Sequence, residues 1–219
     1  LDVFTLNLTY TEKMKENKKT KVCAIDPGVN NFVTCYSESE VCKLGIDCDK
    51  TIGKVCKEVD IIQSRIAKGY YYDGDEKKIV NANRRRNLRK ALHRKIQYIK
   101  DLRNELHNQI IKYLTSKFGK IIITPFKTQE MVCKLSSKIA RKMNTLSHYM
   151  FKQRLKDKCK EMNKKLEIKE EYYTSKTCTR CGNIKKDLGG AKIYECDRCK
   201  MVIERDYNGA RNIMLRNNY

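Results

Sequence analysis

The amino-acid sequence predicts an α/β domain with a mixed β-sheet and a small metal-binding insert near its C-terminal end. Three observations support this fold class. Short apolar runs separated by tight turns open the chain, later apolar runs alternate with two amphipathic helical patterns, and four cysteines form two closely spaced pairs. At 219 residues, the chain has the size of one domain that carries an insert.

The first apolar runs predict an antiparallel meander. Residues 21–26 (KVCAID) end at a Pro-Gly pair, and residues 31–36 (NFVTCY) follow after a tight turn. This arrangement places Asp26 at the rim of a hairpin. Residues 41–46 form a weaker third strand, so we expect the domain to open with three antiparallel strands.

Two helical patterns separate the later strands. Apolar residues recur three or four apart from 88 to 118, which predicts a long amphipathic helix that ends at Gly119. Residues 120–123 (KIII) form an apolar strand of the kind that is buried in a parallel sheet. A second helix is expected over residues 147–163, followed by a strand near residues 165–173.

The order of these elements favours one topology. Parallel strands joined through helices and preceded by an antiparallel meander describe an RNase-H-like mixed sheet, with helices on both faces, better than a doubly wound sheet. Residues 48–87 have little periodicity, and residues 125–145 are polar. We therefore expect both segments to be loops that cross the mouth of the sheet.

Composition and charge favour nucleic acid as a partner. The chain has 48 Lys and Arg against 26 Asp and Glu, a formal net charge of +22. Such an excess would repel itself without an anionic partner. A basic membrane-surface protein is the main competing class, but the densest basic stretch lacks the bulky aromatic face of an interfacial helix. No segment has the apolar length of a membrane span.

Four cysteines predict a structural zinc site. Cys178-x-x-Cys181 and Cys196-x-x-Cys199 provide four soft ligands as two knuckles, which suits tetrahedral zinc. Four protein ligands close the coordination shell, so this metal is not expected to be catalytic. A redox pair or scattered buried cysteines are the alternatives. With 11 cysteines and no signal-peptide pattern, we expect an intracellular, reducing compartment.

Two aspartates far apart in the chain are candidate ligands for catalytic metal ions. Asp26 ends the first strand, at the carboxyl edge where sheets of this type place ligands. Asp206 opens the segment RDYNGARNIMLR, whose apolar spacing is helical. Phosphodiester hydrolysis by two metal ions needs about three or four acidic ligands, so a third acid is required. A turn residue and a helix N-cap are the alternative interpretations of these two aspartates.

Three motifs carry a resemblance to a known family. They are DPGVNNFVT at 26–34, YTSKTCTRCG at 173–182 and RDYNGARNI at 205–213. In this order they resemble the TnpB/OrfB family of transposon-encoded proteins and, in detail, its eukaryotic and giant-virus branch, Fanzor. The segment PFKTQEM at 125–131 also resembles that branch. The resemblance covers the chain from about residue 21 to its end.

The resemblance implies an RNA-guided DNA endonuclease with a RuvC-like site. Its cofactors would be two catalytic Mg²⁺ ions and one structural Zn²⁺ ion, with no small-molecule cofactor and no membrane partner. Its partners would be DNA and a guide RNA transcribed from the element itself. Asp26 would be the first catalytic aspartate and Asp206 the last, both as Mg²⁺ ligands.

The third carboxylate is where this sequence departs from TnpB. The TnpB glutamate ends the strand that here ends in Thr124, and threonine cannot replace a charged metal ligand. The Fanzor branch has a glutamate just before the Tyr-Thr-Ser-Lys-Thr-Cys motif instead, and Glu171 matches it. Glu171 would lie on the following strand, whose carboxyl edge would be one strand spacing away from that of residues 120–123, so the exchange is physically credible. Glu130 is the runner-up, and either glutamate could be an ordinary surface residue.

Seven basic residues crowd the start of the long helix, with few acids between them. An anionic backbone would neutralise them with a steep salt dependence. The resemblance implies a guide–target heteroduplex as the ligand, and a solvated helix face is the alternative. Because no aromatic residue interleaves with the cluster, sequence-specific contacts with nucleobases are not expected. The seven residues are Arg84, Arg85, Arg86, Arg89, Lys90, Arg94 and Lys95.

The resemblance also divides the chain. Residues 1–20 would be a residual strand of an N-terminal wedge domain, residues 21–173 and 205–219 the RuvC-like nuclease domain, and residues 174–204 a zinc ribbon that binds target nucleic acid. Relatives carry a longer N-terminal part, and Leu1 in place of Met suggests that an upstream part is missing here. A eukaryotic or viral host would place the protein in the nucleus or in a viral factory.

Three functional hypotheses follow. The leading hypothesis is a transposon-associated, metal-dependent endonuclease. The rival is a truncated or decayed copy that binds nucleic acid without cleaving it, and the third is a zinc-ribbon interaction module. No strand-transfer chemistry follows from these residues, despite the label transposase that such proteins often carry.

Overall fold

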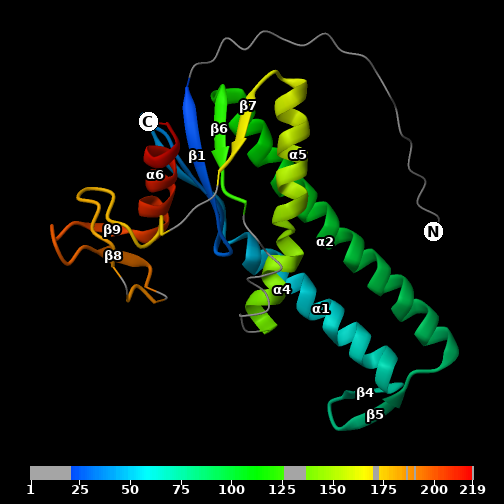
Figure 1. Ribbon diagram of the computed structural model, residues 1–219. Coiled ribbons are helices and arrows are strands. Elements are labelled where there is room, and N and C mark those ends of the chain that lie inside the picture. The colour runs from blue at the N-terminus through cyan, green and yellow to red at the C-terminus, as the bar shows by residue number, and fades with distance from the viewer. Residues whose placement is uncertain (1–20, 126–136, 170–172, 186, 190, 219) are drawn as a thin grey trace.

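A five-stranded mixed sheet forms the centre of the protein. The structure is a computed structural model that describes residues 21–125, 137–169, 173–185, 187–189 and 191–218. The sheet order is β3-β2-β1-β6-β7 (Figure 1). Strands β1 to β3 pair antiparallel, whereas β6 pairs parallel with β1 and with β7, so the predicted mixed sheet is confirmed. The bounds are β1 (Val22–Pro27), β2 (Asn31–Tyr36), β3 (Val41–Ile46), β6 (Lys120–Ile123) and β7 (Lys165–Ile168).

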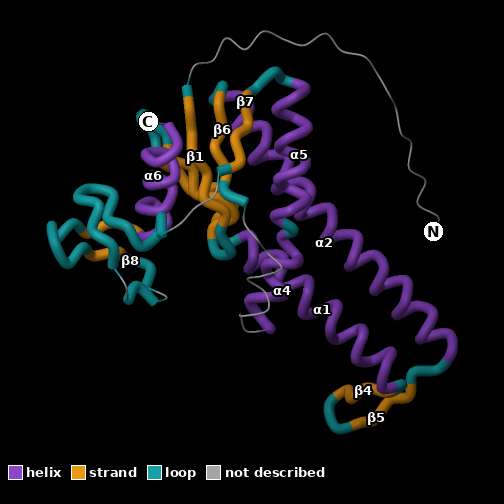
Figure 2. The backbone as a smooth tube through the Cα atoms, in the orientation of Figure 1, coloured by secondary structure: helices purple, strands orange, loops and turns teal. Residues whose placement is uncertain are grey.

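Helices cover both faces of this sheet (Figure 1, Figure 2). Helices α2 (Ala82–Lys117) and α5 (His148–Glu161) lie on one face, and α6 (Arg205–Asn218) lies on the other. Successive residues of a strand point to opposite faces. Cys23 and Ile25 of β1 therefore join the large core beneath α2 and α5, whereas Ala24 between them joins a small core beneath α6.

Helix α2 is longer than its apolar pattern predicts. It begins at Ala82 rather than near residue 88, and it ends at Lys117, one residue before Phe118. The Asn81 side chain accepts a hydrogen bond from the Arg84 backbone N–H at 2.9 Å, which caps the first turn. The first turns of the helix are exposed and basic, so apolar periodicity could not reveal where the helix begins.

The prediction that residues 48–87 are loops at the mouth of the sheet is wrong. This segment contains α1 (Cys48–Lys68) and a hairpin of β4 (Tyr70–Asp73) and β5 (Glu76–Ile79). Helix α1 packs along α2, and the hairpin lies at the far end of the pair (Figure 1). The buried stripe of α1 is narrow: Ile52, Val55 and Val59 are three or four apart among charged residues. A stripe this narrow is easily mistaken for an irregular polar segment.

The prediction of a loop over residues 125–145 is also wrong in part. Helix α4 (Ser137–Leu146) lies at its C-terminal end and buries Met143 and Leu146. Arg141 joins α4 to α1, because its guanidinium donates to both carboxylate oxygens of Asp60, at 2.5 and 2.8 Å. Residues 126–136 lie outside the described part of the chain.

A small insert lies beyond α6, away from the large core (Figure 1). It contains the antiparallel strands β8 (Ile193–Glu195) and β9 (Val202–Glu204) and a core of its own around Tyr194 and Leu188. Within the described ranges, no helix combines the length and apolar character needed to cross a membrane.

Candidate carboxylate and metal sites

The strand register aligns three polar side chains across the central sheet. Asp26 on β1 is paired with Thr34 on β2, and Thr34 is paired with Lys43 on β3. Residues paired across strands share a face of the sheet. The close approach of Asp26 to α6 shows that this is the α6 face. A carboxylate, a buried hydroxyl and an ammonium group thus form a row beneath the first turns of α6.

The two aspartates come to the same end of this face from opposite ends of the chain. The Asn31 side-chain amide, at the start of β2, donates to Asp206 Oδ2 at 3.2 Å. A Cβ atom on Gly209 would lie 2.8 Å from Asp26 Oδ2, so only glycine lets α6 approach this carboxylate without a shift. Asp206 and Gly209 are three residues apart and share one side of α6. The role of the two carboxylates as metal ligands stays a prediction.

Thr124 lies beside Asp26 at the carboxyl edge of the parallel strands. Ile25 is paired with Ile123, so Asp26 and Thr124 are the next residues on neighbouring strands. Thr124 is only 1% exposed, and its hydroxyl has no hydrogen-bond partner among the described residues. A hydroxyl therefore occupies the strand end at which the family resemblance expects the TnpB glutamate.

Both candidate third carboxylates lie outside the described residues. Glu130 falls within residues 126–136, and Glu171 falls within residues 170–172. Strand β7 ends at Ile168, earlier than the predicted end near residue 173. The backbone N–H of Lys169 still donates to the Ile123 carbonyl at 2.9 Å, so the chain runs beside β6 up to this point. The choice between Glu130 and Glu171 stays open.

Lys43 is a residue of this site that the sequence did not single out. Its ammonium group pairs with Glu204, at the end of β9, and lies 5.0 Å from the centre of the Tyr207 ring. Burial alone would lower its pKa, but the hydrogen bond to Glu204 and the charges of Glu204 and Asp206 raise the pKa of Lys43 above its ordinary value. Lys43 therefore stays charged and ties the insert and α6 to the sheet. Only the register of β3 places it there, so no sequence motif could have identified it.

Two asparagines of the RDYNGARNI motif hold the loop before the first cysteine pair. The Asn208 side chain accepts from the Thr179 backbone N–H at 3.1 Å and donates to the Thr177 carbonyl at 2.7 Å. One turn later, the Asn212 side chain donates to the Thr174 and Thr177 carbonyls, both at 2.7 Å. Asn208 and Asn212 are buried, so these bonds form away from water. The motif thus joins α6 to the insert.

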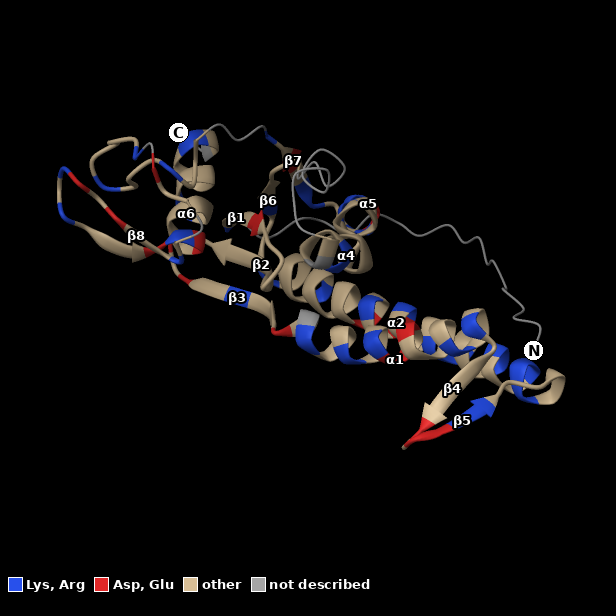
Figure 3. Ribbon diagram, turned by 90° about the horizontal axis from the view of Figure 1, so that it is seen from below, with Lys and Arg blue, Asp and Glu red and all other residues tan. Residues whose placement is uncertain are grey.

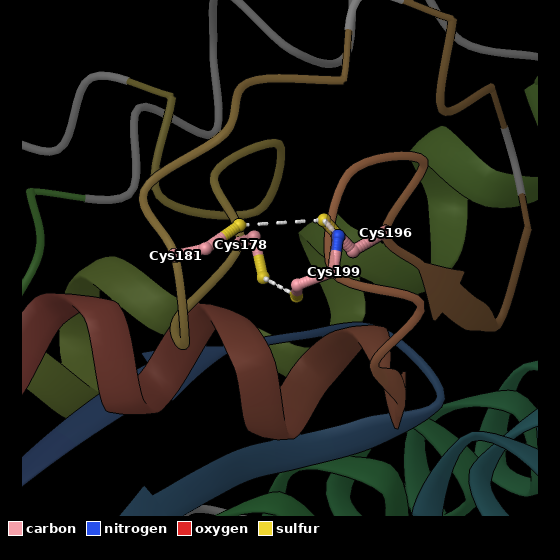
Figure 4. Close-up of side chains that lie close together, drawn as sticks. All are labelled: Cys178, Cys181, Cys196 and Cys199. Atoms are coloured by element: carbon pink, nitrogen blue, oxygen red, sulfur yellow. Dashed lines mark hydrogen bonds between the residues drawn. The ribbon is translucent and has the colours of Figure 1, made fainter.

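The four predicted cysteine ligands converge. Their Sγ atoms all lie within 4.8 Å of one another, and two of the distances, Cys178 to Cys199 and Cys181 to Cys196, are 3.6 Å (Figure 4). A tetrahedral zinc site with Zn–S bonds of about 2.3 Å needs sulfurs about 3.8 Å apart, so this arrangement fits the ion. The backbone N–H of Cys199 donates to Cys196 Sγ, which lowers the pKa of that thiol below its ordinary value and favours the thiolate that zinc binds.

The predicted basic cluster lies along the exposed start of α2, and Figure 3 shows Lys and Arg gathered along both helices of the α1–α2 pair. Lys95 forms an ion pair with Glu58 of α1 at 2.6 Å, so it differs from the rest of the cluster. A hollow of about 840 Å³ follows this part of α2. Its lining includes Arg85, Arg86, Arg89, Lys90, His93 and Arg94.

Comparisons with known proteins agree with this architecture. The family described as "Cas12f1-like, TNB domain" matches residues 148–213, which include α5, the insert and most of α6. A solved structure of a Cas12f1–sgRNA–target DNA complex aligns with a TM-score of 0.59 at 16% identity, over 92% of this chain and 51% of that one. This likeness concerns the fold alone. The protein is therefore an α/β protein with the RuvC-type mixed sheet and an inserted four-cysteine cluster.

Relatives at higher identity identify the family. The TnpB-like protein L79 of Acanthamoeba polyphaga mimivirus is 34% identical over 93% of this chain, and the TnpB-like protein R854 of the same virus has the same identity and coverage. The CRISPR-associated endodeoxyribonuclease Cas12f1 of Sulfoacidibacillus thermotolerans is 35% identical over 36% of this chain. The TnpB-like relatives assign the chain to the TnpB family, so the resemblance to that family is confirmed, whereas kinship with the Fanzor branch stays a prediction. The chain spans about 39% of the length of L79.

Proposed function

We propose that this protein is the catalytic part of a transposon-associated, RuvC-like endonuclease that hydrolyses DNA phosphodiester bonds by two-metal catalysis. The observation that carries this proposal is the approach of Asp26 and Asp206 to one end of the sheet, where Asn31 donates to Asp206 and Gly209 leaves room for Asp26. Within a full-length protein, we propose that cleavage is guided by RNA and directed at DNA. Relatives named as TnpB-like proteins and as a Cas12f1 endodeoxyribonuclease support this class of activity.

The residues of the site suit magnesium. Carboxylate oxygens are hard ligands of the kind that Mg²⁺ prefers, and Asp26 and Asp206 supply them from two different elements. Bound Mg²⁺ ions would activate the attacking water and stabilise the leaving oxygen of the phosphodiester. Asn31 orients Asp206 through its amide, and Gly209 leaves room for the Asp26 carboxylate. We propose Glu171 as the third ligand and Glu130 as the runner-up.

The other parts of the chain receive supporting roles. We propose that Cys178, Cys181, Cys196 and Cys199 hold one structural zinc ion, and that residues 174–204 form a ribbon inserted between two parts of the nuclease domain, residues 21–173 and 205–219. We propose that the basic cluster on α2 contacts a guide–target heteroduplex. We also propose that the protein belongs to the Fanzor branch and that it acts in a nucleus or in a viral factory.

A cleavage assay tests the chemistry. A full-length protein that contains this chain, supplied with the neighbouring transcript as guide, should cleave matching DNA only when Mg²⁺ is present. Asp26→Ala, Asp206→Ala and Glu171→Ala should each lower the rate by about a hundredfold or more, because each removes a ligand of the metal ions that stabilise transition-state charge. Asp101→Ala, an exposed carboxylate on α2, is the matched control and should cleave normally.

The outcomes separate the parts of the proposal. Normal cleavage by Glu171→Ala together with loss of cleavage by Glu130→Ala would move the third ligand to Glu130. Normal cleavage by Asp26→Ala would refute the carboxylate site itself.

Thr124 favours a second candidate function, a decayed copy that binds nucleic acid without cutting it. A buried neutral hydroxyl stands next to Asp26, where the family resemblance expects a charged ligand. This candidate predicts salt-sensitive binding of nucleic acid, with no cleavage at any Mg²⁺ concentration. Thr124→Glu then becomes informative, because restored cleavage would identify the lost ligand.

A further inference from the structure

The far end of the α1–α2 pair is a compact, tyrosine-bearing tip, formed by residues 69–80 together with Arg65 and Arg84. Gly69 ends α1 in the left-handed conformation, with a φ of 73°. The Val80 backbone N–H then donates to the Gly69 carbonyl at 2.8 Å, and the Val80 side chain is buried. The β4–β5 hairpin is therefore anchored at its base, and its tyrosines have defined positions.

Tyr71 holds two guanidinium groups without neutralising them. The Arg65 and Arg84 guanidinium carbons lie 4.8 and 4.5 Å from the centre of its ring. A cation–π contact orients an arginine but leaves its charge and its N–H donors for another partner. Within the described residues, neither guanidinium has a carboxylate partner. Lys95, further along α2, differs because it is paired with Glu58 at 2.6 Å.

The other side of the hairpin presents an exposed aromatic surface. Tyr70 and Tyr72 point to the opposite side from Tyr71, and their rings meet edge to face with centres 5.9 Å apart. Tyr72 is 60% exposed, and Lys77 lies 4.4 Å from the centre of the Tyr70 ring. An exposed aromatic ring beside cations is the arrangement on which unpaired bases stack, whereas the bases of a duplex are already stacked on one another.

The charges of the tip favour one path for a polyanion. At the β-turn, Lys78 is paired with Asp73 at 2.7 Å and lies 3.6 Å from Glu76, so the turn itself is acidic or neutralised. Arg65 and Arg84, which have no carboxylate partner among the described residues, lie at the base of the hairpin, and Arg84 continues into the exposed arginines of α2. The phosphates of a bound strand would therefore pass along the foot of the hairpin, while a nucleobase of that strand reaches Tyr72.

We propose that this tip binds an unpaired segment of nucleic acid, with Arg65 and Arg84 contacting phosphates and Tyr72 stacking on a base. Helix α1 has 21 residues, which at 1.5 Å each is about 32 Å. The tip is therefore separate from the carboxylate site, so variants at the tip leave that site in place. The proposal rests on the proposed function only in taking nucleic acid as the partner.

Binding of short probes tests the proposal without cleavage. Fluorescence anisotropy would compare fluorescein-labelled six-nucleotide oligo(dT) with a blunt duplex of eight GC base pairs, using the full chain with EDTA present. We expect Tyr72→Ala to weaken oligo(dT) binding at least about fivefold and to leave duplex binding unchanged. Arg84→Gln should weaken oligo(dT) binding and lower the slope of log affinity against log salt by about one.

Two matched controls lie outside the tip. Tyr149 of α5 is exposed and has Lys152 5.6 Å from its ring centre, and Lys112 is exposed near the other end of α2. Tyr149→Ala and Lys112→Gln should bind oligo(dT) like the unchanged protein. If Tyr72→Ala stays within twofold of the unchanged protein, or loses both probes equally, the assignment to unpaired strands is overturned. If this test succeeds while the full-length protein fails to cleave DNA, the nuclease proposal is refuted and the proposal for the tip stands.

Discussion

The two faces of the central sheet bury different kinds of side chain. Beneath α2 and α5, a continuous core of large apolar residues surrounds two buried histidines. Beneath α6, the buried apolar cluster is limited to Ala24, Ile122, Ile213 and Met214 among the described residues, and charged and amide groups lie beside it. The difference teaches that the residues that stabilise the fold are separated from the candidate metal ligands. The face beneath α2 and α5 supplies most of the apolar burial, while the face beneath α6 keeps carboxylates at an open edge of the sheet.

Deleting a large side chain from the apolar face should have the largest effect on stability. Leu114 of α2 is fully buried, and Leu114→Ala should lower the free energy of unfolding by about 3–5 kcal/mol, because it removes apolar burial and leaves a cavity. Urea denaturation measures this. Leu215→Ala, on the exposed side of α6, should cost less than about 1 kcal/mol. Equal losses in the two variants would contradict the role of burial at Leu114.

Acidification should weaken the same face through its histidines. Burial lowers the pKa of His107 and of His148 to about 4, and the positive charges of Arg154 and Arg103 add to the effect at His107. Both stay neutral in the fold while the unfolded chain binds protons below about pH 6.5. The contribution of the two neutral histidines to the free energy of unfolding is therefore complete above pH 6.5, and it is lost as the pH falls towards 4.

At pH 5, each histidine should cost about 2 kcal/mol of stability relative to pH 7. Thermal or urea unfolding between pH 7 and 5 would measure the slope of the free energy of unfolding against pH. His148→Asn should reduce the slope, and His93→Asn, on the exposed side of α2, is the control. An unchanged slope in His148→Asn would place the acid sensitivity elsewhere.

Loss of one amide on the α6 face should act locally. Asn212→Ala removes the amide that donates to the Thr174 and Thr177 carbonyls, although Asn208 still donates to Thr177, and should cost about 1–3 kcal/mol. Hydrogen exchange should become faster in residues 174–179, ahead of the central sheet, because the loop that holds the first cysteine pair is released. Asn217→Ala, which removes only a bond within α6, should leave that segment protected. Uniform acceleration across the sheet would contradict a local role.

The smallest effect on stability is expected at Gly209. Alanine is better than glycine in a helix by about 1 kcal/mol, but its Cβ would lie 2.8 Å from Asp26 Oδ2, so the two effects oppose each other. Gly209→Ala should leave the free energy of unfolding within about 1 kcal/mol while weakening Mn²⁺ binding, measured by calorimetry. Gly53→Ala, which meets no atom within 4 Å on α1, should leave Mn²⁺ binding unchanged. Unchanged Mn²⁺ binding in Gly209→Ala would remove the argument for a close carboxylate.

Local patterns predicted much of the fold and part of the site. Apolar runs and turns predicted the meander and the buried strand β6, and the cysteine spacing predicted the four-sulfur cluster. Helix α1 was missed because its apolar stripe is narrow and interrupted by charges. The tip was not predicted either, because Tyr71 is 13 residues from Arg84 along the chain and meets it only through the β4–β5 hairpin.

The sequence by itself determined which side chains could do chemistry: the aspartates at element ends, the paired cysteines and the excess of positive charge. Tertiary structure alone decided which of them meet. Strand register placed Lys43 in line with Asp26, and helix packing brought Asp206 to the turn before β2. The physical reason is that local propensity acts over a few residues, whereas register and packing join residues that are far apart along the chain.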